Sequence, residues 1–392
     1  MTAFFHPHWP NLLGIITLAI WLHLLFGRGW FWRVQKLRAD DGRIQPPDSW
    51  PKIVAVVPAR NEEATIGKAV ASLVSQDYPG QFFIVVVDDH SEDETVSLAK
   101  RVSLELGAEE KIRFVAASAL PDGWTGKLWA LNEGVASAAG EGPAFYWFTD
   151  ADITHSPDTL RSLVARAEQN KFDLASLMVL LQARTLPERA LIPAFLYFFL
   201  MLYPPQWIAD DDLSTAGAAG GCILLRRAAL ERIGGFAAIR GEVIDDCALA
   251  RAVKRSDGRV WMGLTRKSES LRIYGTWSEI ADLIARTAFT QLRYSGWLLA
   301  GTLVAMILTY FAPVVLLFSP DSIARIFAMT AWLLMAFSFL PTVRFYRLSP
   351  LWALLLPFTA MFYTYATFLS ALRFWQNKGG QWKGRAQAPR NA

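Results

Sequence analysis

The residues best suited to chemistry are carboxylates that directly follow short apolar runs. Asp150 and Asp152 flank one alanine after the apolar run at 144–148, and Asp88 and Asp89 end another run. Two carboxylates one residue apart at a strand end can share a hard divalent cation, Mg²⁺ or Mn²⁺, which then binds and neutralises diphosphate oxygens. We therefore expect Asp150 and Asp152 to form a metal site for a diphosphate-containing ligand.

A second acidic pair, Asp245 and Asp246, stands just before a helical stretch at 247–254. A carboxylate can take the proton from an attacking hydroxyl, and a neighbouring acid raises the pKa of that base. One carboxylate of this pair could therefore act as a general base, and one could cap the helix, for which we favour Asp245. Lys127, in a glycine-containing loop, is either an ordinary solvated lysine or a contact for phosphate or sugar.

The elements that position these groups alternate between strands and helices. Buried strands are predicted at 52–58, 81–88, 112–115 and 144–148, with helices at 64–75 and from about residue 94. This pattern predicts an α/β domain with a mostly parallel, doubly wound sheet, in which ligands bind beyond the carboxyl ends of the strands. A glycine-rich dinucleotide fingerprint and a Gly-Lys-Ser/Thr phosphate loop are both missing, which excludes a Rossmann dehydrogenase.

Seven short motifs occur in an order that resembles the family 2 glycosyltransferases, which have the GT-A fold. They are P-A-R-N-E-E at 58–63, V-V-D-D-x-S-x-D at 86–93, G-K-x-x-A-L-N-x-G at 126–134, D-A-D at 150–152, G-G-x-x-L-x-R-R at 220–227, I-G-G-F at 233–236 and D-D-x-x-L at 245–249. Each motif is weak alone, but seven in this order are a strong signal. Together they cover about residues 52–295.

The resemblance implies an inverting, metal-dependent transfer of a hexose from a nucleotide-sugar, with UDP as the family's usual nucleotide and GDP as an alternative. It implies that Asp88 and Asp89 contact the nucleoside, that Asp150 and Asp152 hold Mg²⁺ or Mn²⁺ and the diphosphate, and that Asp246, beside Asp245, is the base. The other donor-binding positions that it implies are Pro58, Arg60, Glu62, Lys127 and Arg293. Trp124, Gly220, Gly221 and Tyr294 fall on the acceptor or membrane side.

Within the family, the loop at 121–130 and the apolar segments resemble membrane-bound lipid glycosyltransferases of the ceramide-glucosyltransferase-like kind, and most of all the hopanoid-biosynthesis-associated group. That resemblance implies a lipid hydroxyl acceptor, with a hopanoid as the candidate. Many members carry Q-x-x-R-W before their C-terminal membrane segments, whereas this chain has Thr290, Arg293 and Tyr294 at the corresponding places. Because that motif is often associated with processive synthases, its loss favours a single transfer.

Composition points to a membrane protein. The chain has 392 residues, of which 53% are hydrophobic and 19% charged, with a net charge of +4. Residues 291–392 hold nine Lys/Arg and one acid, so the positive excess lies beside the longest apolar runs and does not indicate a nucleic-acid partner. Apolar segments at 11–26, 297–318, 323–343 and 351–372 approach the ~20 residues that span a bilayer.

The distribution of basic residues predicts the orientation of these segments. Arg28, Arg33, Lys36 and Arg38 follow the first one, which favours a cytoplasmic catalytic domain at a bacterial inner membrane. A fourth full crossing would put the basic tail outside, against the charge rule, so we expect one segment to be re-entrant or interfacial and the tail to be cytoplasmic. A shorter apolar run at 191–203, bracketed by Pro193 and Pro204, is either a core helix or an interfacial helix.

The expected organisation is a transmembrane anchor (1–28), a linker (29–50), a GT-A domain (51–295, with a candidate interfacial helix at 191–207), C-terminal membrane segments (296–373) and a basic tail (374–392). The expected function is transfer of one sugar to a membrane lipid. A processive polysaccharide synthase is the alternative enzyme, although four segments are few for a pore. A transporter or scaffold would leave the strand-end carboxylates unexplained, and its functional polar residues would be expected within the spans.

Overall fold

The computed structural model describes residues 9–39, 44–376, 381–382 and 385–386. The chain forms two compact units. We call Leu37–Gln182 with Trp207–Ile273 the sheet unit, and Met1–Lys36, Ala183–Gln206 and Tyr274–Gly379 the helical unit. Most of the predicted basic tail lies outside the described residues.

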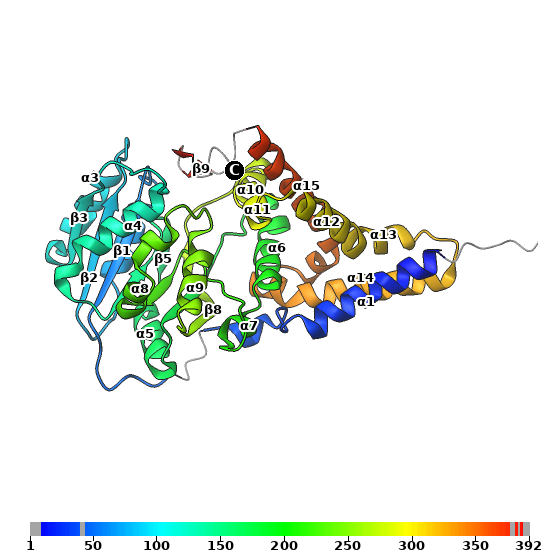
Figure 1. Ribbon diagram of the computed structural model, residues 1–392, viewed down its shortest axis with the longest axis horizontal. Coiled ribbons are helices and arrows are strands. Elements are labelled where there is room, and N and C mark those ends of the chain that lie inside the picture. The colour runs from blue at the N-terminus through cyan, green and yellow to red at the C-terminus, as the bar shows by residue number, and fades with distance from the viewer. Residues whose placement is uncertain (1–8, 40–43, 377–380, 383–384, 387–392) are drawn as a thin grey trace, which may run out of the picture. The chain divides into compact units, whose positions relative to one another are not determined.

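The sheet unit contains an eight-stranded sheet in the order β3-β2-β1-β4-β7-β6-β8-β5 (Figure 1). β1 pairs in parallel with β2 and β4, β2 with β3, and β6 with β8, whereas β7 and β5 pair antiparallel with their neighbours. The mostly parallel α/β sheet predicted from the sequence is confirmed. The strands are β1 (Ile53–Ala59), β2 (Phe82–Asp88), β3 (Ile112–Ala116), β4 (Phe145–Phe148), β5 (Ile153–His155), β6 (Leu174–Leu180), β7 (Ile223–Arg226) and β8 (Val260–Ser270).

Helices cover both faces of this sheet because its central strands are buried on both sides. Ile53, Ala55 and Val57 of β1 pack into a core with side chains of α2 (Ile66–Val74), α3 (Thr95–Glu105) and α5 (Thr159–Asn170). On the other face, α4 (Gly126–Ser137) approaches β1 so closely that a Cβ at Gly134 would lie 2.4 Å from a methyl group of Val56. α8 (Arg227–Arg232) and α9 (Asp245–Arg255) follow β7.

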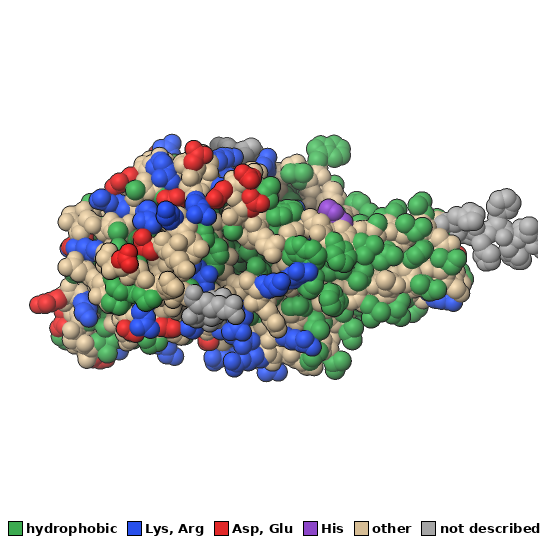
Figure 2. All heavy atoms as spheres, turned by 90° about the horizontal axis from the view of Figure 1, so that it is seen from below, with side chains coloured by type: hydrophobic (Ala, Val, Ile, Leu, Met, Phe, Trp, Pro, Cys, Tyr) green, Lys and Arg blue, Asp and Glu red, His purple; other side chains and the backbone are tan. Residues whose placement is uncertain are grey.

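The helical unit holds the apolar segments. Four helices in the described part of the chain are long and apolar enough to cross a membrane: Trp9–Gly27, Gly296–Leu316, Ser322–Phe345 and Pro350–Trp375. The first is α1 and the third is α14; the second comprises α12 (Gly296–Met306), a π-helical turn (Ile307–Phe311) and α13 (Ala312–Leu316). Large apolar side chains lie exposed along α1 and α14, including Leu12, Ile15, Ile326, Leu333 and Phe337 (Figure 2).

Contacts within the helical unit fix the direction of its long helices. Asn11 donates a hydrogen bond to Asp321, and Gly14 lies against Phe327, so α1 and α14 run in the same direction. Leu316 packs with Ala324. The second segment therefore ends where α14 begins, and the start of α12 and the end of α14 lie away from that turn.

The fourth apolar segment bends back on itself. It begins as a 3₁₀ helix (Pro350–Leu355), whose Leu354 carbonyl accepts a hydrogen bond from Trp332 near the middle of α14. α15 (Leu356–Trp375) then runs to the start of α12, where Ala371 packs with Leu299. The segment thus begins and ends at the same end of the bundle, the end away from the α13–α14 turn.

Three shorter helices complete the helical unit: α6 (Leu186–Leu202), α10 (Trp277–Ala285) and α11 (Ala288–Gln291). α6 begins five residues before the predicted start at residue 191, and Pro193 lies inside it instead of bounding it. The Tyr197 and Ser338 hydroxyls share a 2.7 Å hydrogen bond, and the Tyr363 hydroxyl donates to the Leu191 carbonyl. These buried contacts make α6 a core helix of this unit. α15 ends beside α10 and α11 (Figure 1).

Candidate active site

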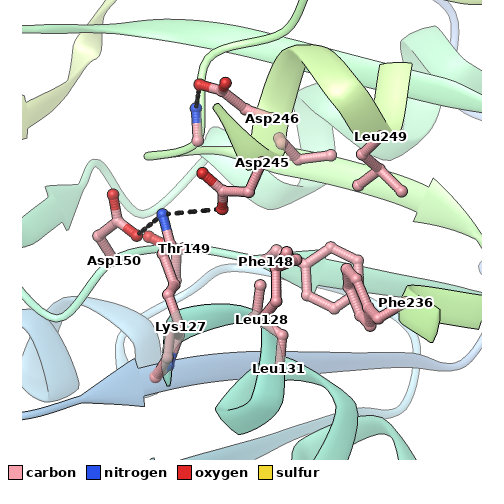
Figure 3. A pocket seen from close by; sticks show the side chains of 13 residues that line it. Lys127, Leu128, Leu131, Phe148, Thr149, Asp150, Phe236, Asp245, Asp246 and Leu249 are labelled. Carbon is pink, nitrogen blue, oxygen red and sulfur yellow. Dashed lines mark hydrogen bonds and ion pairs between the residues drawn. The ribbon is translucent and has the colours of Figure 1, made fainter. Parts of the chain in front are cut away.

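The carboxyl ends of β1 and β4 border a small open pocket (Figure 3). Its polar end collects predicted residues from five separate stretches of the sheet unit: Pro58, Lys127, Asp150, Gly220, Asp245 and Asp246. Its other walls are apolar. The sheet topology therefore gathers side chains that lie far apart in the sequence, as expected for parallel strands.

Lys127 joins two of the acidic clusters. Its ammonium lies 2.8 Å from Asp150 Oδ1 and 3.4 Å from Asp245 Oδ2 (Figure 3). Burial alone would lower the pKa of Lys127, but these two carboxylates outweigh burial and raise it above its ordinary value. Lys127 therefore stays positively charged. Of the two alternatives that the sequence left open for Lys127, an ordinary solvated lysine does not fit, because its side chain is mostly buried and ion-paired.

Asp246 is held by the backbone. Its Oδ2 accepts a 2.9 Å hydrogen bond from the amide of Gly220, and its Oδ1 accepts one from the amide of Cys247. A Cβ at Gly220 would lie 3.2 Å from the Lys127 ammonium nitrogen and 3.5 Å from Asp246 Oδ2, so glycine permits this close approach. Burial, together with repulsion from Asp245, raises the pKa of Asp246 to about 6. A carboxyl that titrates near neutrality suits a general base.

Asp245 does not cap α9 through its side chain, contrary to the prediction. The residue before the first turn of α9 is Ile244, and Asp245 already lies within that turn. Its carboxylate turns instead toward Lys127. Ion pairing with the lysine replaces the helix-capping contact.

The predicted metal ligands lie on the turn between β4 and β5. Burial and the nearby carboxylates of Asp150 and Glu62 raise the pKa of Asp152 to about 6. Such a concentration of negative charge favours a cation. Among the described residues, no group of three or more His, Cys, Asp or Glu side chains could enclose an ion. The residues therefore fit a Mg²⁺ or Mn²⁺ that takes one or two carboxylates and completes its coordination with substrate phosphates.

The loops after β1 and β2 interlock. Arg60 donates hydrogen bonds to the backbone carbonyls of Asp89 and His90, and Asn61 exchanges hydrogen bonds with Ser91 and Glu92. The Arg60 guanidinium thus braces the loop at the end of β2.

Only one member of the Asp88–Asp89 pair can meet a ligand in this conformation. Asp89 has no exposed surface, whereas Asp88 is half-buried and accepts a hydrogen bond from the amide of Ser91. The interlocked loops cover Asp89, so the nucleoside contact predicted for both aspartates fits Asp88 alone.

Four further predicted residues do not line the pocket: Trp124, Gly221, Arg293 and Tyr294. Trp124 precedes α4 and meets Trp129 edge to face, while Gly221 directly follows Gly220. Arg293 and Tyr294 belong to the helical unit, where both adopt positive φ and the Tyr294 ring stacks on Phe374. Their predicted roles at the diphosphate and the acceptor remain predictions.

The sequence did not predict the apolar walls of the pocket or the buried histidine that lies behind it. Phe148 and Phe236 meet edge to face on one wall, beside Leu128, Leu131 and Leu249. Phe236 ends the I-G-G-F motif, which was a usable signal for this wall. Behind the turn that carries Asp150 and Asp152 lies His155, and burial lowers its pKa to about 3, so its ring is neutral. Nothing in its sequence context distinguished His155 from a surface residue.

Residues 54–234 match a protein-family model described as Glycosyl transferase family 2. This part of the chain is a family 2 glycosyltransferase domain. A mannosyltransferase from Pyrobaculum calidifontis, solved in complex with GDP-Man and Mn²⁺, aligns over 92% of this chain and 99% of its own with a TM-score of 0.56 at 18% identity. At that identity the likeness concerns the fold, which is of the GT-A type.

Curated relatives of the family 2 domain include a beta-monoglucosyldiacylglycerol synthase from Synechocystis sp., 36% identical over 116 residues, which are 29% of this chain and 22% of that protein. The Bacillus subtilis protein named "Probable glycosyltransferase YdaM" is 29% identical over 210 residues, which are 51% of this chain and 44% of that protein. The chain thus spans less than half the length of either relative.

Proposed function

We propose that the protein is a membrane-bound, inverting glycosyltransferase that moves one sugar from a nucleotide-sugar to a lipid hydroxyl. The observation that carries this proposal is the cluster of Lys127, Asp150, Asp245 and Asp246 at the strand ends of a family 2 domain. The four long apolar helices support a membrane location. The relative named as a glucosyldiacylglycerol synthase supports a lipid acceptor.

In the proposed reaction, the acceptor hydroxyl attacks the anomeric carbon of the donor while Asp246 accepts the hydroxyl proton. Hydrogen bonds from the Gly220 and Cys247 amides hold the Asp246 carboxylate in place. Asp150 and Asp152 would hold the Mg²⁺ or Mn²⁺, which when bound neutralises the departing diphosphate. The Lys127 ammonium, 2.8 Å from Asp150, adds a second positive charge on the donor side. One displacement inverts the anomeric configuration without a covalent intermediate.

The donor and the acceptor are identified by one assay. Purified protein in detergent is incubated with Mn²⁺, labelled UDP- or GDP-sugars, and lipid acceptors that include a hopanoid polyol and diacylglycerol. The motif resemblance favours the hopanoid, and the named relative favours diacylglycerol. A labelled lipid carrying one sugar supports the proposal, whereas a long polysaccharide product or the absence of transfer from every donor contradicts it.

The pH dependence of the reaction follows from Asp246. Because its raised pKa of about 6 means that the proton stays bound below that pH, the base is inactive in acid. We expect kcat/KM, which reports the free enzyme, to fall about tenfold per pH unit below about pH 5 and to level off above about pH 7. A rate profile measured from pH 4.5 to 8.5 checks this. A rate that does not change between pH 5 and 7 would contradict the assignment of the base.

We further propose that Pro350–Trp375 enters the bilayer and returns to the same side. Its path within the helical unit supports this, because Ala371 meets Leu299 near the start of α12, while Arg347 just precedes the segment. The basic residues after α1 and α14 favour the cytoplasmic side for that end. The tail is then cytoplasmic, which removes the conflict between its charge and the number of apolar segments.

Reporter fusions test this topology. Green fluorescent protein, which fluoresces only in the cytoplasm, and alkaline phosphatase, which is active only in the periplasm, are each joined after residue 392 and after Pro320. We expect fluorescence from the fusion at 392 and phosphatase activity from the fusion at 320. Phosphatase activity at 392 would mean that the fourth segment crosses the membrane.

A further inference from the structure

A buried histidine stands behind the candidate active site. His155 is the last residue of β5, three positions after Asp152, and only 5% of its surface is exposed. Its ring packs on Trp147 with a centroid distance of 4.6 Å. Both ring nitrogens have partners: Nε2 lies 2.8 Å from the hydroxyl of Thr149, and Nδ1 lies 2.8 Å from the hydroxyl of Ser268. Ser268 is also the residue that pairs with His155 across β5 and β8.

The directions of these hydrogen bonds follow from the backbone carbonyl of Gly221, which stands at one end of the series of hydrogen bonds. The Thr149 hydroxyl donates its single proton to the carbonyl of Gly221, 3.0 Å away, because a carbonyl can only accept. Thr149 must therefore accept from His155, which puts the imidazole proton on Nε2. The unprotonated Nδ1 then accepts the proton of Ser268. Burial keeps the ring neutral, and of the two neutral tautomers only Nε2–H satisfies all three bonds.

This series of hydrogen bonds reaches both the turn that carries the donor-side carboxylates and the backbone that holds the proposed base. Thr149 immediately precedes Asp150, on the donor side. Gly221 immediately follows Gly220, whose amide donates to the Asp246 carboxylate at 2.9 Å. His155 therefore connects β8 to the donor-side turn and, through Thr149, to the backbone that holds the base.

We propose that His155 is a positioning residue which, as the Nε2–H tautomer, uses Thr149 and Gly221 to hold the donor-side carboxylates and Asp246 at a fixed separation. This inference rests on the proposed function for its catalytic consequence. Hydrogen-bond partners behind ligating groups commonly change activity by roughly 10- to 100-fold when they are removed. A fixed separation matters here because the attacking hydroxyl and the leaving diphosphate must lie on opposite sides of the anomeric carbon.

The tautomer is testable without any activity measurement. The protein contains five histidines, and ¹⁵N-histidine labelling distinguishes the protonated from the unprotonated nitrogen of each ring. We expect one ring to remain the neutral Nε2–H tautomer from pH 5 to 8, and its Nε2 shift to change in Thr149→Val, which identifies it as His155. An Nδ1–H tautomer, or titration of this ring within that range, would overturn the proposal.

The catalytic consequence is tested with a pair of variants at Thr149. Thr149→Val keeps the shape of the side chain but removes the hydroxyl, and we expect kcat to fall roughly 10- to 100-fold. Thr149→Ser keeps the hydroxyl and should restore kcat to within about threefold of wild type. A role in stability alone would lower the melting temperature in the valine variant without separating the two variants in kcat at a temperature where both are folded.

A matched control uses the same chemical change elsewhere in the sheet unit. Thr159, 2% exposed at the start of α5, loses a similar buried hydroxyl in Thr159→Val, and its kcat should stay within about twofold of wild type. If wild-type protein transfers sugar and Thr149→Val is equally active, the positioning role is wrong. If wild-type protein transfers no sugar from any donor, the proposed function fails, while the tautomer measurement still decides the hydrogen-bond chain.

Discussion

Asp246→Asn is expected to lower kcat by roughly 10²–10⁴-fold, the usual contribution of a general base. The amide keeps the size of the carboxylate and still offers an oxygen to the amide of Gly220. It loses only the hydrogen bond from the Cys247 amide, so the fold and the donor pocket should survive. It can no longer accept the proton of the acceptor hydroxyl. Rates of sugar transfer to lipid, together with the Kd for nucleotide measured in the presence of Mn²⁺, separate lost chemistry from lost binding.

The matched control for this variant is Asp245→Asn. Asp245 lies in the same helical turn but pairs with Lys127, which keeps Asp150 as a second partner. Because Asp245 is not the proposed base, its neutralisation should cost less than about tenfold in kcat. Because the charge of Asp245 helps to raise the pKa of Asp246, its removal should also move the acidic limb of the rate profile to lower pH. A larger loss in Asp245→Asn than in Asp246→Asn would reverse the two assignments.

Asp150→Ala is expected to weaken metal-dependent nucleotide binding by about 100-fold or more, because the bound cation contributes several kcal/mol and each 1.4 kcal/mol is a factor of ten. It also removes the partner 2.8 Å from the Lys127 ammonium. Titration of UDP and GDP into the purified protein, with Mn²⁺ and again with EDTA, measures the effect directly. Transfer activity should fall with the affinity.

The control for this variant is Asp211→Ala. Asp211 also forms an ion pair, 3.1 Å from Arg259, but its side chain is 55% exposed and does not line the pocket. Its loss should leave the nucleotide affinity within about twofold of wild type. If the wild-type protein binds nucleotide equally well in EDTA, the metal assignment is wrong whatever the variants do.

Local patterns in the sequence were enough to predict the elements. The strand ending at Asp88 and the one before Asp150 lie where predicted, because short β-branched or aromatic runs that end in polar residues have few other structures available. A likeness to known motifs then placed Lys127, Asp150 and Asp246 at one end of the sheet. The position of these residues depends only on the order of the strands in the sheet, and the order of the motifs along the chain predicts that strand order.

Distances between side chains could not be predicted in this way. Lys127 pairs with Asp150 and Asp245 across loops that are remote in sequence, and which oxygens meet depends on the packed fold. For the same reason Asp245 was assigned to a helix cap that it does not make. The burial of Asp89 and the bracing role of Arg60 follow from two loops that interlock, a three-dimensional relation that neither loop reveals alone.

The path of the fourth apolar segment could not be predicted from its composition either. Its length and hydropathy allow a crossing. The backward turn is defined instead by tertiary contacts, such as the bond from Trp332 to the Leu354 carbonyl and the packing of Ala371 on Leu299. Charge balance predicts that a simple series of crossings is insufficient, but it does not indicate which segment differs.

The position of α6 in the chain has a consequence for biosynthesis. α6 lies between β6 and β7, yet it contacts α10, α14 and α15, which are translated later. A nascent chain that has completed the sheet still displays the buried side of α6, including Leu191 and Tyr197, with none of those partners available. We therefore expect the nascent chain at that stage to expose an apolar surface that is prone to aggregation. For the same reason, a soluble fragment ending at Ile273 is a poor choice for crystallisation.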